Sequence, residues 1–424
     1  MTRHARSGLA GLVAMGLLLI AGCGGGAAQG TTLRGDGEAR VVPLTAATAV
    51  PSMVDAARRI GATTLATAPK DGNTVISPAS LAMALAMLTE GARGETLEAL
   101  EATLGAAGEG RRDAIAALRG ALLAYDGDPA LATAKELPER PLVHLANQVV
   151  VDDGYEPSLA FLDALVDVFD AGVQSTDLST QAGMDVLSAW IKQHTGGLIE
   201  KTAIEPSPDL RLVLQDAVLL AARWRTPFNP GWTAPLPFTL PDGAEVETET
   251  MGAMESWAYA EVDGWQAIRL PYVEALHADI LLPPEGADPA AASADLLARV
   301  SAALDAAAPS MVVLSLPTLD VGPEKLDLME ILPAVGAPVL CADGPDLSGI
   351  GPGDLCVLQA AQQAVLRVDE EGTVAAAVTE IAVGESAAPE PDHELRFNRP
   401  YLFTISHTET GWPLFLAAIR DPRH

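Results

Sequence analysis

The sequence predicts an α+β fold in which helices come early in the chain and large antiparallel sheets come late. Helical spacing of apolar residues occurs in the first half, for example at 77–90 and 158–169. Short apolar runs bounded by turn residues occur mainly in the second half. The last two, 401–406 and 414–419, flank a Glu-Thr-Gly turn and predict a hairpin. A hydrophobic fraction of 49% is typical of a globular protein.

The helices are predicted from apolar spacing and from their end signals. Pro78 falls in the first turn of the segment 77–90, where a proline removes no helical hydrogen bond. Further helices are expected at 96–104, 158–169 and 187–194, and the last of these ends at a Thr-Gly-Gly sequence.

The strands are predicted from runs rich in Val, Ile and Leu. The run at 212–220 is mostly apolar but contains one acid, Asp216. The polar, proline-containing segment 127–141 is expected to be a surface excursion. Besides the closing hairpin, strands are expected at 145–151, 212–220, 267–270, 278–282, 311–316 and 357–368.

The amino terminus has the composition of a secretion signal. Arg3 and Arg6 precede an apolar run that is too short for a membrane span. The residues before Cys23 resemble a bacterial lipobox, so we expect residues 1–22 to be a signal peptide and Cys23 to be lipidated. An ordinary secretion signal that contains a cysteine is the alternative. Both readings place the protein outside the cytoplasm, either secreted or lipid-anchored to the membrane.

The rest of the chain is expected to be a tether and one domain. Residues 23–42 begin with a glycine-rich stretch and predict a flexible tether. Residues 43–424 contain no internal repeat and no further long apolar run, so they predict a single domain.

Two cysteines, Cys341 and Cys356, flank a stretch rich in glycine and proline. An extracytoplasmic location permits a disulfide across that loop, with a reactive thiol or a metal pair as the weaker alternatives. With 7 His and 3 Cys scattered along the chain, a zinc framework is excluded, and we expect no metal and no cofactor.

The charge balance restricts the partners. Lys and Arg total 26 against 56 Asp and Glu, which gives a net charge of −30. Such a surface repels phosphate backbones, so nucleic acid is excluded as a partner. Basic patches that adhere to anionic lipid are not expected either, so contact with the membrane would be through the lipid anchor only.

Motifs of enzymes are missing from the sequence. It has no Gly-x-Ser-x-Gly elbow, no His-Glu-x-x-His and no glycine-rich phosphate loop after a strand. The sequence therefore predicts that the protein is not an enzyme. We expect the histidines that lack motif neighbours to be surface or capping residues, namely His144, His194, His277, His393, His407 and His424.

The segment 369–391 combines features of a strand and of a loop. Burying Glu380 would cost on the order of several kcal/mol unless it were paired, so only the face without it can point into a sheet. The segment then ends in Gly-Glu-Ser-Ala-Ala-Pro, which is typical of a protease-accessible loop. An edge strand followed by a turn is the alternative. By alternation, the uncharged face carries Thr373, Ala375, Ala377, Thr379, Ile381 and Val383, and the other carries Val374, Ala376, Val378, Glu380 and Ala382.

Motifs from nearly the whole mature chain resemble those of the serpin family. The Asp-Glu-Glu-Gly-Thr sequence at 369–373, followed by three alanines, resembles the hinge of the serpin reactive-centre loop. The resemblance implies the serpin fold, with mixed, mainly antiparallel sheets, about eight or nine helices and an exposed reactive-centre loop at about 370–393. Further serpin-like motifs follow in the family's order at 76–80, 91–96, 190–199, 212–217, 224–243, 346–350, 397–403 and 413–417.

The resemblance implies an irreversible suicide-substrate inhibitor of serine proteases, with cysteine proteases as a further class. The protease cleaves the loop, and the loop then inserts into the main sheet and traps the acyl-enzyme. Small hinge residues favour inhibition; a non-inhibitory serpin acting as a cell-surface binding or chaperone-like protein is the alternative. The hinge comprises Glu370, Glu371, Gly372, Thr373, Val374, Ala375, Ala376, Ala377 and Val378.

The family's spacing from Gly372 implies a reactive bond between Ser386 and Ala387. The neighbouring bonds, which involve Glu385 and Ala388, are the alternatives, because counting back from Phe397 lands about three residues later. Small residues here favour elastase-like or subtilisin-like targets, whereas Glu385 would favour a glutamate-specific protease. We expect a monomer.

The resemblance also assigns residues to the opening of the main sheet. Ser77, Ser80, Asp216 and Gln362 belong to the region beneath the sheet called the shutter, and Trp224 to the breach at its top. Asp216 and Gln362 stand where the family has an asparagine and a histidine, and we expect the carboxylate and the amide to hydrogen-bond. Trp224 is also expected to be a packed core aromatic.

Overall fold

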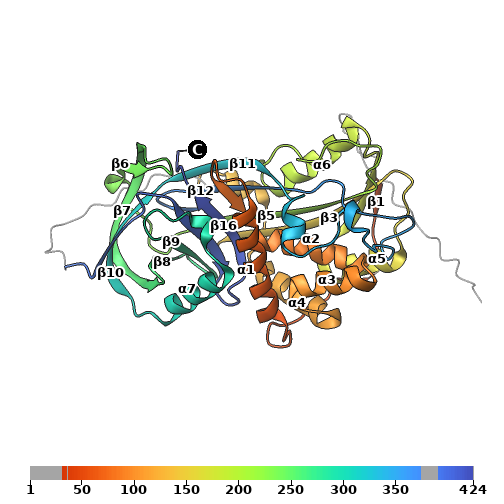
Figure 1. The fold of residues 1–424 in the computed structure, drawn as a ribbon, viewed down its shortest axis with the longest axis horizontal. Coiled ribbons are helices and arrows are strands. Elements are labelled where there is room, and N and C mark those ends of the chain that lie inside the picture. The colour runs from red at the N-terminus through yellow and green to blue at the C-terminus, as the bar shows by residue number, and fades with distance from the viewer. Residues whose placement is uncertain (1–30, 36, 374–389, 424) are drawn as a thin grey trace, which may run out of the picture.

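The computed structural model describes residues 31–35, 37–373 and 390–423. The signal peptide, Cys23, the hinge residues from Val374 to Val378 and the candidate reactive bonds between Glu385 and Ala388 lie outside the described residues. A helix-rich half and a strand-rich half are joined by long strands that run through both (Figure 1).

The first sheet has seven strands among the described residues, in the order β1-β4-β3-β5-β13-β12-β11. Its middle is formed by β5, β13 and β12, and the short strand β13 is antiparallel to both neighbours. Consequently β5 and β12 run parallel to each other. The bounds are β1 Thr31–Leu33, β4 Gly172–Thr176, β3 Leu142–Asp152, β5 Leu212–Arg223, β13 Gly372–Thr373, β12 Ala361–Val368 and β11 Leu319–Asp327.

The second sheet follows the order β14-β10-β7-β8-β9-β15-β16-β2, and β6 pairs with β7 outside this path. The predicted closing hairpin is present, because β15 and β16 pair antiparallel. The bounds are β14 His393–Arg396, β10 Ser310–Pro317, β7 Glu245–Val262, β8 Trp265–Pro271, β9 Leu276–Leu282, β15 Tyr401–His407, β16 Pro413–Ile419, β2 Thr74–Ile76 and β6 Ala234–Thr239.

Eight α-helices accompany these sheets in the described part of the chain. The helix beneath the first sheet, α2, is buried along nearly its whole length, as its apolar composition requires. Ser77 caps it, because its side chain accepts a hydrogen bond from the Ser80 N–H. The bounds are α1 Val50–Thr67, α2 Pro78–Gly91, α3 Gly94–Leu104, α4 Gly108–Leu122, α5 Leu159–Ala164, α6 Gln181–His194, α7 Ala294–Ala306 and α8 Ile331–Ala334.

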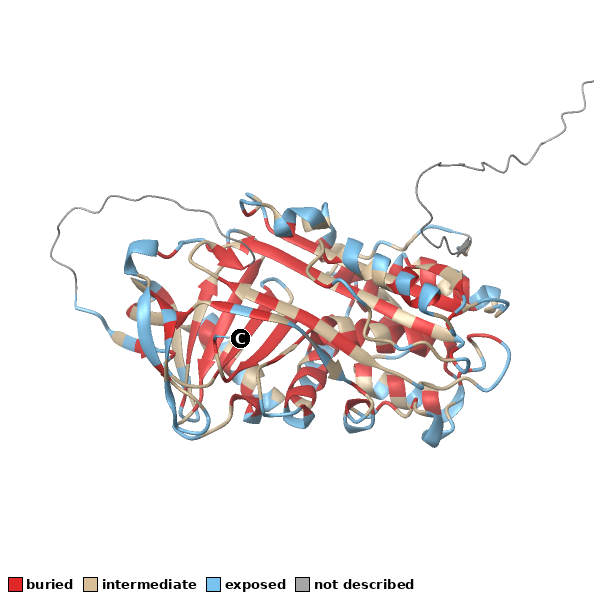
Figure 2. Ribbon diagram, turned by 90° about the horizontal axis from the view of Figure 1, so that it is seen from above, coloured by how far each residue is buried: buried red, intermediate tan, exposed pale blue. Residues whose placement is uncertain are grey.

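The α+β prediction is confirmed, with some differences in detail. Buried residues concentrate in the strands and in the helices packed on them (Figure 2). The strand expected from 357 begins only at Ala361, and the excursion 127–141 is not purely superficial, since Leu137 is buried. Sequence patterns did not reveal α1, α4, α7 or the long strand β7.

Candidate functional site

The first sheet is open along its middle. Away from the hinge, β5 and β12 share no neighbouring strand within the described residues, and a cavity of about 300 Å³ lies between them. We call this gap the slot. The inner edges of β5 and β12, the helix α2 and the connection from α6 to β5 line it. Among the described residues, the slot therefore has the form of an unfilled strand position.

The top of the slot is occupied by the two-residue strand β13. Gly372 pairs with Arg223, while Thr373 pairs with Ala222 on one side and with Val368 on the other. A Cβ at Gly372 would lie 2.0 Å from the Ala222 carbonyl oxygen, so only glycine fits there. The part of the hinge that is described thus already lies between the two strands.

Thr373 faces the core. Its residue exposure is 3%, and its hydroxyl lies 2.6 Å from the hydroxyl of Tyr272, which is fully buried. Burial raises the pKa of Tyr272 far above its usual range, so the phenol remains neutral. The inward direction of Thr373 agrees with the face that alternation selects for the interior.

A tight turn precedes Thr373. The Asp369 N–H donates to the Gly372 carbonyl at 2.9 Å, and the Asp369 carboxylate accepts from the N–H groups of Glu371 and Gly372. Burial raises the pKa of Asp369 to about 6; the two backbone hydrogen bonds oppose this shift, and the charges of Glu370 and Glu371 add to it. The turn therefore contains a carboxyl group that titrates close to neutral pH.

Residues after β5 hold the hinge from the other side. The N–H groups of Trp224 and Phe228 donate to the carbonyls of Glu371 and Glu370, each at 2.8 Å. The Thr233 hydroxyl donates to the Glu370 carboxylate at 2.5 Å. These three contacts fix Glu370 and Glu371 before the loop begins.

Trp224 occupies the breach as a core aromatic. Its residue exposure is 2%, it stacks on Tyr272 with ring centroids 4.3 Å apart, and its Nε1–H donates to the Asp369 carbonyl at 3.0 Å. Both roles expected for Trp224 thus agree with its position.

Beneath the sheet, Gln362 binds the backbone of Ser77. Its Nε2 donates to the Ser77 carbonyl, and its Oε1 accepts from the Ser77 N–H, both at 3.0 Å. This pair ties β12 to the start of α2. The hydrogen bonds of the Gln362 side chain go to the Ser77 backbone and Asp216 Oδ1 accepts none, so the expected hydrogen bond between Gln362 and Asp216 is not formed, and that expectation was wrong.

Asp216 consequently has an unsatisfied carboxyl oxygen. Its side chain lines the slot, and its Oδ1 is covered and accepts no hydrogen bond. Burial raises the pKa of Asp216 well above its ordinary value of 3.8. Burial therefore favours the protonated form of this acid, and its Oδ1 lacks a hydrogen-bond partner in this conformation.

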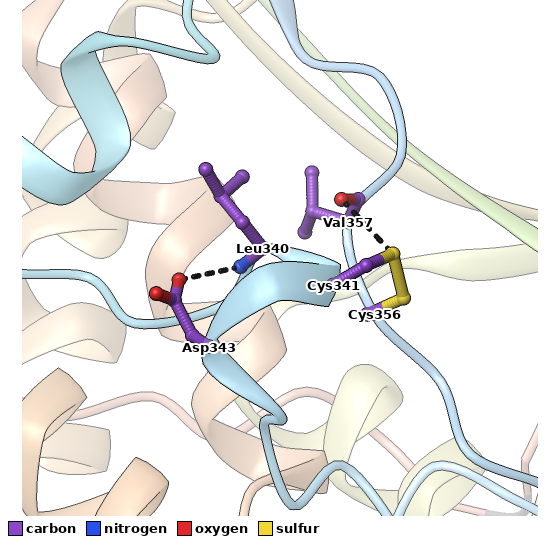
Figure 3. The surroundings of a disulfide bond; sticks show 5 residues. All are labelled: Leu340, Cys341, Asp343, Cys356 and Val357. Atoms are coloured by element: carbon purple, nitrogen blue, oxygen red, sulfur yellow. Dashed lines mark hydrogen bonds between the residues drawn. A yellow bond between two sulfur atoms is a disulfide. The ribbon is translucent and has the colours of Figure 1, made fainter.

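At the far end of the slot, Cys341 and Cys356 are joined in a disulfide (Figure 3). Cys341 begins a short 3₁₀ turn, and Cys356 lies in the segment that leads into β12. Leu340 and Val357 beside them form an isolated parallel bridge. The entry to β12 is thus attached covalently to a neighbouring segment.

Other expectations from the sequence concern catalysis, metals and membranes. His277 and His407 are buried, with exposures of 4% and 3%, so their expected surface or capping position was wrong. Within the described ranges we find no cluster of three or more His, Cys, Asp or Glu that could hold a metal ion. Nor does any helix in those ranges have the length and hydropathy needed to span a membrane.

Sequence analysis missed several residues of the site. Tyr272 and Thr233 contact the hinge from segments far from it in the chain, and no local motif marks them. Gln359, which lies before β12, was also missed. Its hydrogen bonds to Glu205 become apparent only when the two segments are seen side by side.

Comparison with known proteins identifies the family. The family model described as serpin (serine protease inhibitor) matches residues 59–422. Iripin-3 of Ixodes ricinus is 31% identical over 358 residues, covering 82% of this chain and 88% of the relative. A protein named serine protease inhibitor from Cyanea capillata is 30% identical over 362 residues, covering 82% and 92%.

Solved structures agree with this fold. Tengpin, a thermophilic serpin in its native state, superposes with a TM-score of 0.77 at 22% identity, covering 93% of this chain and all of that one. Serpin-12 of Manduca sexta gives a TM-score of 0.74 at 22% identity, covering 88% and 99%. The slot, the hinge at its top and these matches lead to one conclusion: the chain belongs to the serpin family.

Proposed function

We propose that the protein is a suicide-substrate inhibitor of serine proteases, which traps the acyl-enzyme by inserting its cleaved loop into the slot. Serpins are generally protease inhibitors, and the proposal concerns how this chain would act. The observation that carries it is the position of Gly372 and Thr373 between β5 and β12, above a vacant strand position.

The register of β13 predicts where each inserted residue would go. Six residues beyond Thr373, Thr379 would lie opposite Asp216 on β5 and Gln362 on β12, on the face that points toward α2. Its hydroxyl could then donate to the Asp216 oxygen that now has no partner. Glu380 would point to the opposite face of the sheet, away from α2.

The driving force comes from groups that are unsatisfied before insertion. An inserted strand would pair with the inner edges of both β5 and β12, and each new backbone hydrogen bond contributes about 1 kcal/mol net. Small and apolar side chains on the inward face would fill the cavity, adding burial at about 25 cal/mol per Å².

An uncut loop has its two ends in different sheets. Thr373 pairs in the first sheet, and β14, which follows the loop, pairs with β10 in the second. While β14 stays paired with β10, a loop held at both ends cannot extend down the slot. Cleavage therefore releases the driving force at once, whereas insertion of the uncut loop would require β14 to detach and would be far slower.

The protease performs the chemistry and this chain supplies the substrate. The catalytic serine of the protease would attack the carbonyl carbon of Ser386, and the amine of Ala387 would leave, which gives an ester between protease and inhibitor. Insertion would pull the attached protease along the sheet and distort its triad and oxyanion hole, so hydrolysis of the ester stalls. Elastase-like or subtilisin-like proteases are the proposed targets, because the bond lies between small residues.

The proposed setting is outside the cytoplasm. Cleavage of residues 1–22 and lipidation of Cys23 would tether a monomer to the membrane through residues 23–42, with a secreted form as the alternative. Metabolic labelling with a fatty acid, compared between the wild type and Cys23→Ser, tests the anchor.

Mixing the mature protein with elastase or subtilisin tests the inhibitory mechanism. An inhibitor gives a covalent complex that survives boiling in detergent. It also releases a carboxyl-terminal peptide whose mass matches a chain that begins at Ala387. A binding or chaperone-like protein would instead be cleaved without retaining the protease, and that result would contradict the proposal.

A further inference from the structure

The end of the slot farthest from the hinge is bridged by side-chain hydrogen bonds. Gln359, two residues before β12, donates from Nε2 to the Glu205 carbonyl and accepts at Oε1 from the Glu205 N–H, both at 2.9 Å. Glu205 lies in the connection from α6 to β5. Glu205 precedes β5 and Gln359 precedes β12, so this pair joins the two sides of the slot. We call it the latch.

The segment that carries Gln359 is fixed to the helical half of the molecule. The Cys341–Cys356 disulfide and the hydrogen bond from the Val357 N–H to the Val339 carbonyl hold it just before the latch. Further along the disulfide loop, the Asp346 carbonyl accepts from the Arg93 N–H, and the Gly349 N–H donates to the Gly91 carbonyl. Gln359 is therefore presented to Glu205 from a base anchored on the turn after α2.

The latch lies where an inserting strand would finish. Val368 pairs with the hinge, and Gln359 precedes it by nine residues, or about 30 Å at 3.3 Å per residue. An inserted strand of this length would pair with both sides of the slot. It would therefore separate Gln359 from Glu205. Partial insertion near the hinge leaves the latch intact.

We propose that Gln359 is a positioning residue: with Glu205 it keeps the far end of the slot closed against premature insertion, and the Cys341–Cys356 disulfide holds it in place. This inference rests on the proposed inhibitory function. It separates two steps, entry of the hinge at the top and completion of insertion at the bottom. Weakening the latch lowers the barrier to spontaneous insertion of the uncut loop.

The disulfide makes the latch sensitive to reduction. Cys341 is exposed, so a small dithiol can reach it. The dithiol transfers two electrons and two protons: the S–S bond breaks, two cysteine thiols form, and the reductant becomes a cyclic disulfide. The segment that carries Gln359 then loses its covalent attachment, while Gln359 itself is unchanged.

The first test compares Gln359→Ala with Gln363→Ala, a matched glutamine on β12 outside the latch. Hydrogen exchange of the peptide containing the Glu205 N–H reports the latch directly and needs no protease. Gln359→Ala should raise the exchange rate of the Glu205 N–H by about 5- to 30-fold, and Gln363→Ala should not. Gln359→Ala alone should also raise, by a similar factor, the rate at which the uncut protein converts to a heat-resistant, non-inhibitory form. Equal values in the two variants would overturn the proposal.

The second test adds dithiothreitol and the double variant Cys341→Ala/Cys356→Ala. Each should raise the exchange of the Glu205 N–H in an otherwise wild-type chain but add little in Gln359→Ala, because both changes act on the same latch. Independent, fully additive effects would show that the disulfide does not act through Gln359. Covalent capture of elastase by the wild type, measured in parallel, reports the proposed function separately.

Discussion

The hydroxyl of Thr373 lies 2.6 Å from the hydroxyl of Tyr272, in a closed part of the core at the top of the slot. This contact seats the described part of the hinge between β5 and β12. Thr373 meets three requirements of this position. Its side chain is small, its hydroxyl is a hydrogen-bond partner for the buried phenol of Tyr272, and it points toward the core.

Replacing Thr373 by arginine should convert an inhibitor into a substrate. A guanidinium cannot be buried at 3% exposure without a partner, so insertion would stall and the ester would be hydrolysed. Thr373→Ser keeps the hydroxyl and should remain an inhibitor. Denaturing gels that compare covalent complex with cleaved inhibitor distinguish the two outcomes, and a persistent complex in Thr373→Arg would contradict the hinge argument.

Removing the acid at Asp216 should reduce the pH dependence of stability. The pKa of Asp216 in the folded protein lies well above the ordinary 3.8. The stability that the protonated acid contributes to the folded state is therefore fully present below pH 3.8 and is lost as the pH rises through the raised pKa. The Tm of the wild type should therefore fall toward alkaline pH, and Asp216→Asn should flatten that slope. An unchanged slope in the variant would mean that Asp216 does not titrate there.

The fold was predictable because its signals are local or ordered along the chain. Apolar spacing identified α2 and the closing hairpin, and the hinge sequence at 369–373 lies where the structure has the short strand β13. In contrast, β7 was missed because its 18 residues alternate irregularly between exposed and buried, with no continuous apolar run. Strand pairing with β6, β8 and β10 stabilises it, and that is not visible in its own sequence.

Hydrogen-bond partners in the site were less predictable than its location. Asp216 and Gln362 both line the slot, but the partner of Gln362 is the Ser77 backbone and not Asp216. The N–H and C=O of Ser77 offer a donor and an acceptor to the two ends of one glutamine side chain. Such choices depend on distances that sequence spacing does not give.

The turn at Asp369 should titrate in a range that is easy to measure. Its pKa of about 6 exceeds the ordinary 3.8, so the seated hinge is most stable below pH 3.8 and loses stability as the pH rises through about 6. Trp224 donates to the Asp369 carbonyl, so its fluorescence should change with a midpoint near pH 6. Asp369→Asn should abolish this transition, and a transition that persists in the variant would assign it to another group.

The face of the loop that enters the core can be tested with one substitution at two neighbouring positions. From the register of β13, Ala377 would lie opposite Val218 and Ala364 on the inward face, and Ala376 would point outward. Ala377→Glu should therefore block insertion, while Ala376→Glu should be tolerated.

Cleavage of the wild type and of Ala376→Glu should raise Tm by roughly 10 °C or more, because many backbone hydrogen bonds form at once. The Tm of cleaved Ala377→Glu should stay close to that of its uncut form. Equal rises in both variants would show that the strand enters in another register, and no rise in the wild type would show that it does not enter at all.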